Sequence, residues 1–166
     1  MLWKGRKGAI GALGRIAPNY YILDGVVPRS KLVETMLKVS EISDRFGFPV
    51  ANVFHAGDGN LHPNLLFDER IPGTTEKVLQ AGAEIMSVCV AAGGTLSGEH
   101  GVGYEKQRFM PWLYNETDIE NMRSVRTAFG NLGMFNPCKI LPEGSGCGEI
   151  ANIPKALSAA GPDAWI

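Results

Sequence analysis

Three histidines and one glutamate are the residues of this chain whose types and spacing suit chemistry. His55 and His62 flank an Asp-Gly pair at 58–59, and His100 directly follows Glu99 in a glycine-rich segment. Two imidazoles and a carboxylate form a ligand set for a divalent transition metal, with water or substrate in the open positions. We therefore expect zinc, manganese or iron to bind His55, His62 and Glu99.

The residues around the first two histidines predict a β-hairpin. An Asp-Gly pair favours a two-residue type I′ turn, because both central residues of that turn need a positive φ. Strand-like residues stand on both sides of the pair, at 49–54 and 61–67. A turn centred between residues 58 and 59 places His55 directly opposite His62, on one face of the hairpin. Asn64, two residues beyond His62, is expected on the same face.

His100 is the candidate for acid–base chemistry, since the unperturbed pKa of histidine is the nearest to neutrality. A divalent cation nearby disfavours the imidazolium form and leaves a neutral base. The alternative for His100 is a fourth metal ligand or a loop-packing residue. The alternative for the whole site is a pair of stacked cross-strand histidines, His55 and His62, beside a solvated Glu99.

The spacing of apolar residues predicts the helices and strands that position these residues. Apolar residues at helical spacing predict helices that begin near Ser30, near Thr74 and near Asp118. A strand is expected within 20–28, and residues 2–16 form a weaker helix because four glycines interrupt them. The order β-α-β-β-α-loop-α predicts an α+β fold, with helices on one face of an antiparallel sheet. Such a small sheet has unprotected edges, so we expect a fragment that needs another polypeptide segment beside it.

Composition narrows the class of protein further. The chain has 166 residues and a formal net charge of −1, which fits one domain and argues against nucleic-acid binding. It contains no apolar run of the ~20 residues that span a membrane. Three cysteines predict no disulfide framework, and the expected compartment is cytoplasmic. Residues 1–142 are expected to form the domain, and the Gly-, Ala-, Ser- and Pro-rich residues 143–166 a loosely ordered tail.

Five segments form a recognisable set: 3–7, 20–28, 55–64, 97–106 and 135–142. Together they resemble the C-terminal cap domain of FAD-linked oxidases of the vanillyl-alcohol oxidase superfamily. Within that family they are similar to the FAD-linked subunit of glycolate oxidase and to the D-lactate and D-2-hydroxyglutarate dehydrogenases. The resemblance implies a partial ferredoxin-like cap domain. It also implies oxidation of a small 2-hydroxy acid, glycolate or D-lactate, to the 2-oxo acid, with a hydride passing to FAD.

The resemblance assigns roles to the residues named above. It implies that His55, His62 and Glu99 bind the metal and that His100 takes the hydroxyl proton. Arg6 is implied to hold the substrate carboxylate, since a guanidinium can donate two parallel, charge-assisted hydrogen bonds to it.

The resemblance also assigns residues that bind the substrate and the flavin. Asn64 is implied to bind substrate, and Asn136 and Lys139 to contact FAD. Cys138 stands where the family usually has the glycine of Asn-Pro-Gly-Lys. If the backbone there has a positive φ, a cysteine costs roughly 1 kcal/mol or more.

The resemblance leaves out the FAD-binding domain, so the chain is expected to be inactive unless that domain comes from another chain or a longer parent protein. Two alternatives stay open. One is a stand-alone metalloenzyme with a two-histidine, one-carboxylate triad, either a non-haem iron oxygenase or a zinc hydrolase. The other is a truncated, non-catalytic fragment that docks onto a partner subunit.

Overall fold

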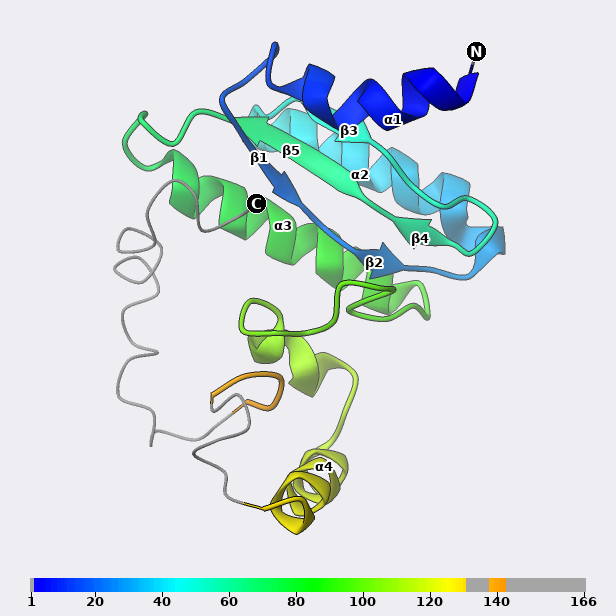
Figure 1. Ribbon diagram of the computed structural model, residues 1–166, viewed down its shortest axis with the longest axis vertical. Helices are drawn as coiled ribbons and strands as arrows, with labels where there is room; N and C mark the ends of the chain where they lie inside the picture. Colours follow the sequence, from blue (N-terminus) through cyan, green and yellow to red (C-terminus); the bar gives the residue numbers. More distant parts are fainter. Residues whose placement is uncertain (1, 131–137, 143–166) are drawn as a thin grey trace.

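The computed structural model describes residues 2–130 and 138–142, which form an α+β arrangement (Figure 1). The elements are α1 (Leu2–Leu13), β1 (Asn19–Ile22), β2 (Gly25–Val26), α2 (Leu32–Phe46), β3 (Val50–Asn52), β4 (Asn60–Leu61), β5 (Pro63–Phe67), α3 (Thr74–Ala91) and α4 (Glu116–Ala128). Short 3-10 turns lie at Arg29–Lys31 and Gln107–Trp112. The tail 143–166 and Asn136 lie outside the described residues.

The sheet is antiparallel and places β5 between β1 and β3. Asn64 of β5 lies opposite Ile22 of β1 and Ala51 of β3, so these three residues share one face of the sheet. Strands β2 and β4 form a separate antiparallel pair. A bridge between Val26 and Thr95 then ties the segment after α3 to β2.

Helices α2 and α3 cover the opposite face of the sheet, and the hydrophobic core lies between these layers. Val39 of α2 and Ile85 of α3 are buried in one cluster with Leu23 and Leu65 of the sheet layer. Each of these side chains is at most 1% exposed. The predicted α+β fold, with helices packed on one face of an antiparallel sheet, is therefore confirmed.

Local hydrogen bonds and backbone angles set the ends of α2 and α4, and two of the helix starts differ from the prediction. Gly47, with a φ of +78°, ends α2 as expected, whereas a 3-10 turn at Arg29–Lys31 replaces Ser30 as the start of the helix. Helix α4 begins earlier than predicted because the side chains of Asn115 and Asp118 each accept a backbone N–H of the other residue, which forms a capping box.

The hairpin that carries the histidines has a different register from the predicted one. The His55 N–H donates to the Asn60 carbonyl at 2.9 Å, so His55 pairs with Asn60 and not with His62. Val53 lies opposite His62 instead, with its N–H donating to the His62 carbonyl at 3.2 Å. The loop therefore comprises the four residues 56–59 and is not a two-residue type I′ turn. Because the two pairs are two residues apart, His55 and His62 still share a face.

A contact with Val27, the residue that directly follows β2, accounts for this register. Gly59 has a φ of +73°, and a Cβ built on it would overlap the Val27 carbonyl oxygen. The Val27 N–H also donates to the Gly59 carbonyl at 3.0 Å. The turn is thus set by a strand that lies about thirty residues earlier in the chain, which a local turn pattern does not contain.

The cysteines differ from expectation at one position. Cys89 is free and buried, whereas Cys138 is disulfide-bonded, a bond that the sequence analysis did not predict. Cys138 also has a φ of +61°, which is the backbone conformation that favours the glycine usual in the family. No helix among the described residues is long and apolar enough to cross a membrane.

Candidate active site

The hairpin and the loop after α3 bring His55, His62 and Glu99 together. The Glu99 Oε1 lies 3.2 Å from Nε2 of His62 and 3.4 Å from Nε2 of His55. One possible ligand atom from each of the three residues lies within 4.8 Å of the other two. The two imidazole rings are 5.5 Å apart and nearly perpendicular, at 88°. The three predicted ligands therefore surround one small volume.

His62 is the most enclosed member of this group. Its side chain is 12% exposed, and its buried Nε2 has no hydrogen-bond partner among the described residues. Burial, and then the neighbouring His100, lower the pKa of His62, and these effects outweigh the opposing carboxylates of Asp24 and Glu99. At neutral pH His62 is thus uncharged, so its 3.4 Å contact with Asp24 is not an ion pair. A neutral imidazole with an unused nitrogen is the form that binds a metal, and this residue fits that role.

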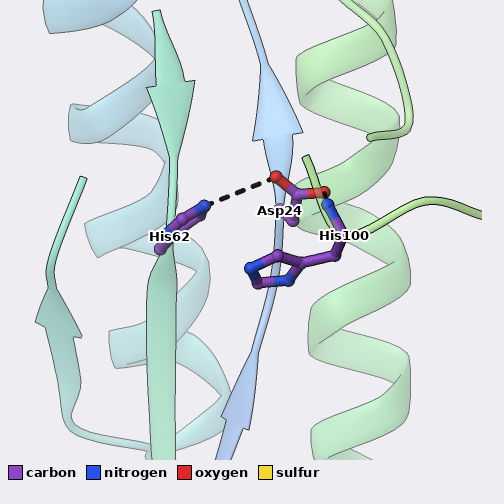
Figure 2. Close-up of side chains that lie close together, drawn as sticks. All are labelled: Asp24, His62 and His100. Atoms are coloured by element: carbon purple, nitrogen blue, oxygen red, sulfur yellow. Dashed lines mark hydrogen bonds and ion pairs between the residues drawn. The ribbon is translucent and has the colours of Figure 1, made fainter. Parts of the chain in front are cut away.

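His100 lies beside His62 on the exposed side of the group. The two ring centroids are 4.8 Å apart, and the rings are tilted by 33°. Figure 2 shows the side chains of His62, His100 and Asp24 close together, with a dashed line for the 3.4 Å contact between His62 Nε2 and Asp24 Oδ1. The His100 side chain is exposed to solvent, whereas its main-chain N–H donates to Asp24 at 3.0 Å.

Asn64 lies on the same sheet face but is held by the backbone. It is 1% exposed, and its Nδ2 donates to the carbonyls of Ala51 at 2.9 Å and His62 at 2.8 Å. Its Oδ1 is buried and has no partner among the described residues. The Asn64 amide therefore ties the main chain of His62 to β3, and its carbonyl oxygen is the atom left for a further contact.

The remaining predicted residues lie farther along the chain. Arg6 is on α1, and its side chain lies outside the described part of the structure. Lys139 is exposed, and its carbonyl accepts a hydrogen bond from Arg126 of α4 at 2.7 Å. The Ile140 N–H donates to Gly103 at 2.6 Å, which connects residues 138–142 to the segment just after His100.

Asp24 is the site residue that the sequence analysis missed. It lies beyond the end of β1 and is fully buried. Its carboxylate accepts hydrogen bonds from two side chains, Ser97 Oγ at 2.6 Å and Lys106 Nζ at 3.2 Å. It also accepts three main-chain N–H groups, those of Gly98 at 3.1 Å, Glu99 at 3.3 Å and His100 at 3.0 Å.

Asp24 stays ionised although it is buried. Burial alone would raise its pKa, but the hydrogen bonds from Ser97 and from the His100 N–H, together with the Lys106 charge, hold that pKa well below its usual range. The sequence did contain one signal that could have identified Asp24: it is the single charged residue in the strand-like, otherwise apolar run 20–27.

The chain matches a known family over most of its length. The family described as FAD linked oxidases, C-terminal domain, matches residues 1–140. The chain is 43% identical over 148 residues to the glycolate oxidase subunit GlcD of Escherichia coli strain K12, which covers 89% of this chain and 30% of that protein.

Two more distant relatives agree with this match. Identity to the glycolate oxidase subunit GlcD of Bacillus subtilis is 34% over 139 residues, covering 84% of this chain and 30% of that protein. Identity to a D-lactate dehydrogenase of Archaeoglobus fulgidus is 32% over 120 residues, covering 72% of this chain and 26% of that protein. The chain thus spans less than a third of the length of these relatives. It belongs to the family formed by the C-terminal domain of FAD linked oxidases.

Proposed function

We propose that this chain supplies part of the substrate-facing cap domain of an FAD-dependent dehydrogenase of small 2-hydroxy acids. The carrying observation is the convergence of His55, His62, Glu99 and His100 from two segments about forty residues apart. Relatives named glycolate oxidase subunit and D-lactate dehydrogenase support glycolate or D-lactate as the substrate. The FAD-binding domain is supplied by a further segment or by another chain.

The reaction divides the hydrogen atoms of the substrate between two acceptors. The imidazole of His100 would accept the hydroxyl proton, and FAD, when bound, would supply the acceptor for the hydride from the α-carbon. The substrate would thus lose one proton and one hydride and become the 2-oxo acid. His100 suits this role because its ring is exposed at the edge of the group and its backbone is anchored by Asp24.

The other residues bind and orient. His55, His62 and Glu99 would hold a zinc, manganese or iron ion, whose chemistry is Lewis-acid polarisation of the α-hydroxyl. Arg6 would pair with the substrate carboxylate, and the unpartnered Oδ1 of Asn64 would accept a hydrogen bond at the buried side of the site.

Two proposals concern the flavin and the compartment. Asn136 and Lys139 would contact FAD. For Lys139, the hydrogen bond from the neighbouring Ile140 N–H to Gly103, three residues after His100, supports a place near the histidine group. A cytoplasmic location stays a prediction.

Metal analysis together with flavin reduction tests the proposal. We would measure metal content for the purified chain, for His55→Ala and for His62→Ala, with Glu41→Gln, an exposed site on α2, as the control. The chain would then be mixed anaerobically with a flavin-domain partner and glycolate or D-lactate. Stoichiometric metal that is lost in both histidine variants, and flavin bleaching only in the mixture, are the expected results.

Other outcomes separate the alternatives. Tight metal with turnover in the absence of flavin would indicate a stand-alone metalloenzyme. A chain that neither binds metal nor promotes flavin reduction would be a non-catalytic fragment, and the proposal would be wrong. In the mixture, His100→Ala should keep the metal and lose flavin reduction; near-normal reduction would remove His100 from the role of base.

A further inference from the structure

The buried carboxylate of Asp24 determines the shape of the loop that carries Glu99 and His100. We propose that Asp24 is a positioning residue: it holds loop 97–101 so that Glu99 meets His55 and His62, and it is not itself a metal ligand. This inference rests on the proposed function, because it concerns the arrangement of the same metal site.

The first argument is the convergence of the loop backbone on a single side chain. The N–H groups of Gly98, Glu99 and His100 all donate to Asp24. Successive N–H groups that point to one centre form a nest that binds an anion. In this chain the anion is the chain's own carboxylate, so the direction of each peptide group in the loop depends on Asp24.

The Ser97 hydroxyl links the start of the same loop to Asp24 and to the end of the loop at Gly101. Its Oγ donates to Asp24 at 2.6 Å and accepts the Gly101 N–H at 2.7 Å. Residues 98–101 are exposed, so burial in a core does not hold them in place. The hydrogen bonds to Asp24 and Ser97 thus hold the backbone of this segment.

The second argument concerns which carboxylate is available to a metal. Asp24, His62 and His100 also lie close enough together to hold an ion. However, the Lys106 ammonium lies 3.2 Å from Asp24 Oδ2, and the two side chains are only 5% and 0% exposed. A divalent cation on Asp24 would face this buried positive charge, and it would compete with five donors that already bind the carboxylate. The Glu99 side chain is 51% exposed and reaches both His55 and His62, so Glu99 is the ligand.

Amide exchange and metal affinity test the proposal together. We would compare the wild-type chain with Asp24→Asn, using Asp44→Asn on an exposed position of α2 as the matched control. In metal-free protein, the amides of residues 98–100 should exchange about tenfold faster in Asp24→Asn than in the wild type or the control. Affinity for Zn²⁺ should fall about 10- to 100-fold in the same variant, as expected when a group that orients a ligand is lost.

Ser97 provides a milder variant in case Asp24→Asn fails to fold. Ser97→Ala should accelerate exchange at residues 98–101 and weaken Zn²⁺ binding several-fold, whereas Ser97→Thr, which keeps the hydroxyl, should restore both. The absorption spectrum of bound Co²⁺ should change in Ser97→Ala and return in Ser97→Thr, at unchanged global stability. A purely structural role would not produce that spectral change.

Two results would overturn the proposal. Unchanged amide exchange and unchanged Zn²⁺ affinity in folded Asp24→Asn would show that Asp24 does not order the loop. Loss of Zn²⁺ binding with unchanged amide exchange would make Asp24 a ligand. If the wild-type chain binds no metal, the proposed metal site is wrong, while the exchange data still show whether Asp24 orders the loop.

Discussion

Gly59 offers the sharpest test of the hairpin that positions His55 and His62. Its φ of +73° lies in the left-handed region, and a Cβ on it would overlap the Val27 carbonyl oxygen. Gly57, in the same four-residue loop, has no atom within 4 Å of a built Cβ and no positive φ. Gly59→Ala and Gly57→Ala therefore make the same chemical change in two different environments.

The expected cost of Gly59→Ala follows from two effects. An L-residue in the left-handed region costs roughly 1–2 kcal/mol relative to glycine. Relief of the overlap moves the turn away from β2 and sacrifices the hydrogen bond from the Val27 N–H to the Gly59 carbonyl, which contributes about 1 kcal/mol. The free energy of unfolding should thus fall by about 2–3 kcal/mol in Gly59→Ala, and by no more than about 0.5 kcal/mol in Gly57→Ala.

Urea unfolding followed by circular dichroism measures both values, and Zn²⁺ titration shows whether the displaced turn also weakens the metal site. Equal stability of the two variants would refute the contact between the turn and β2.

Asp58→Gly gives a second check of the turn. In a type I′ turn this change would be neutral or stabilising, because residue 58 would have a positive φ. In the observed loop it should destabilise by roughly 0.5–1 kcal/mol, because glycine loses more conformational freedom on folding.

Two other regions of the chain give further predictions. Ile140 has a φ of +74°, so Ile140→Gly should raise the free energy of unfolding by about 1 kcal/mol, measured as a higher midpoint in urea. Ile71→Gly, at another exposed isoleucine without a positive φ, should lower it, and a lower midpoint for Ile140→Gly would contradict the backbone assignment. Burial raises the pKa of Cys89 to about 12, so iodoacetamide should leave this thiol unmodified at pH 8 and react once urea unfolds the chain. Because the folded-state pKa is raised, this thiol favours the folded state at neutral pH, and that contribution is lost as pH rises above the pKa of the unfolded thiol. Rapid alkylation of Cys89 in the folded protein, read by peptide mapping, would contradict its burial.

The sequence by itself determined the features that depend on local periodicity. Apolar spacing predicted α2, α3 and α4, since a helical repeat of 3.6 residues is a property of the segment itself. The predicted hairpin placed His55 and His62 on one face by direct pairing. That pairing was wrong, but the observed register differs from it by two residues, which keeps both side chains on the same face. The five segments that include the two histidine motifs identified the family, which the match over residues 1–140 confirms.

Only the tertiary structure decided how distant segments meet. The hairpin register depends on a contact between Gly59 and Val27, and the loop that carries Glu99 depends on Asp24, whose partner Ser97 is 73 residues away in sequence. A turn pattern carries no information about a strand that approaches from elsewhere. A lone aspartate in an apolar strand does not show which donors will surround it. Such contacts arise when the folded core brings β1, β2 and the loop after α3 into contact, so their geometry is a property of the packed molecule and not of any one segment.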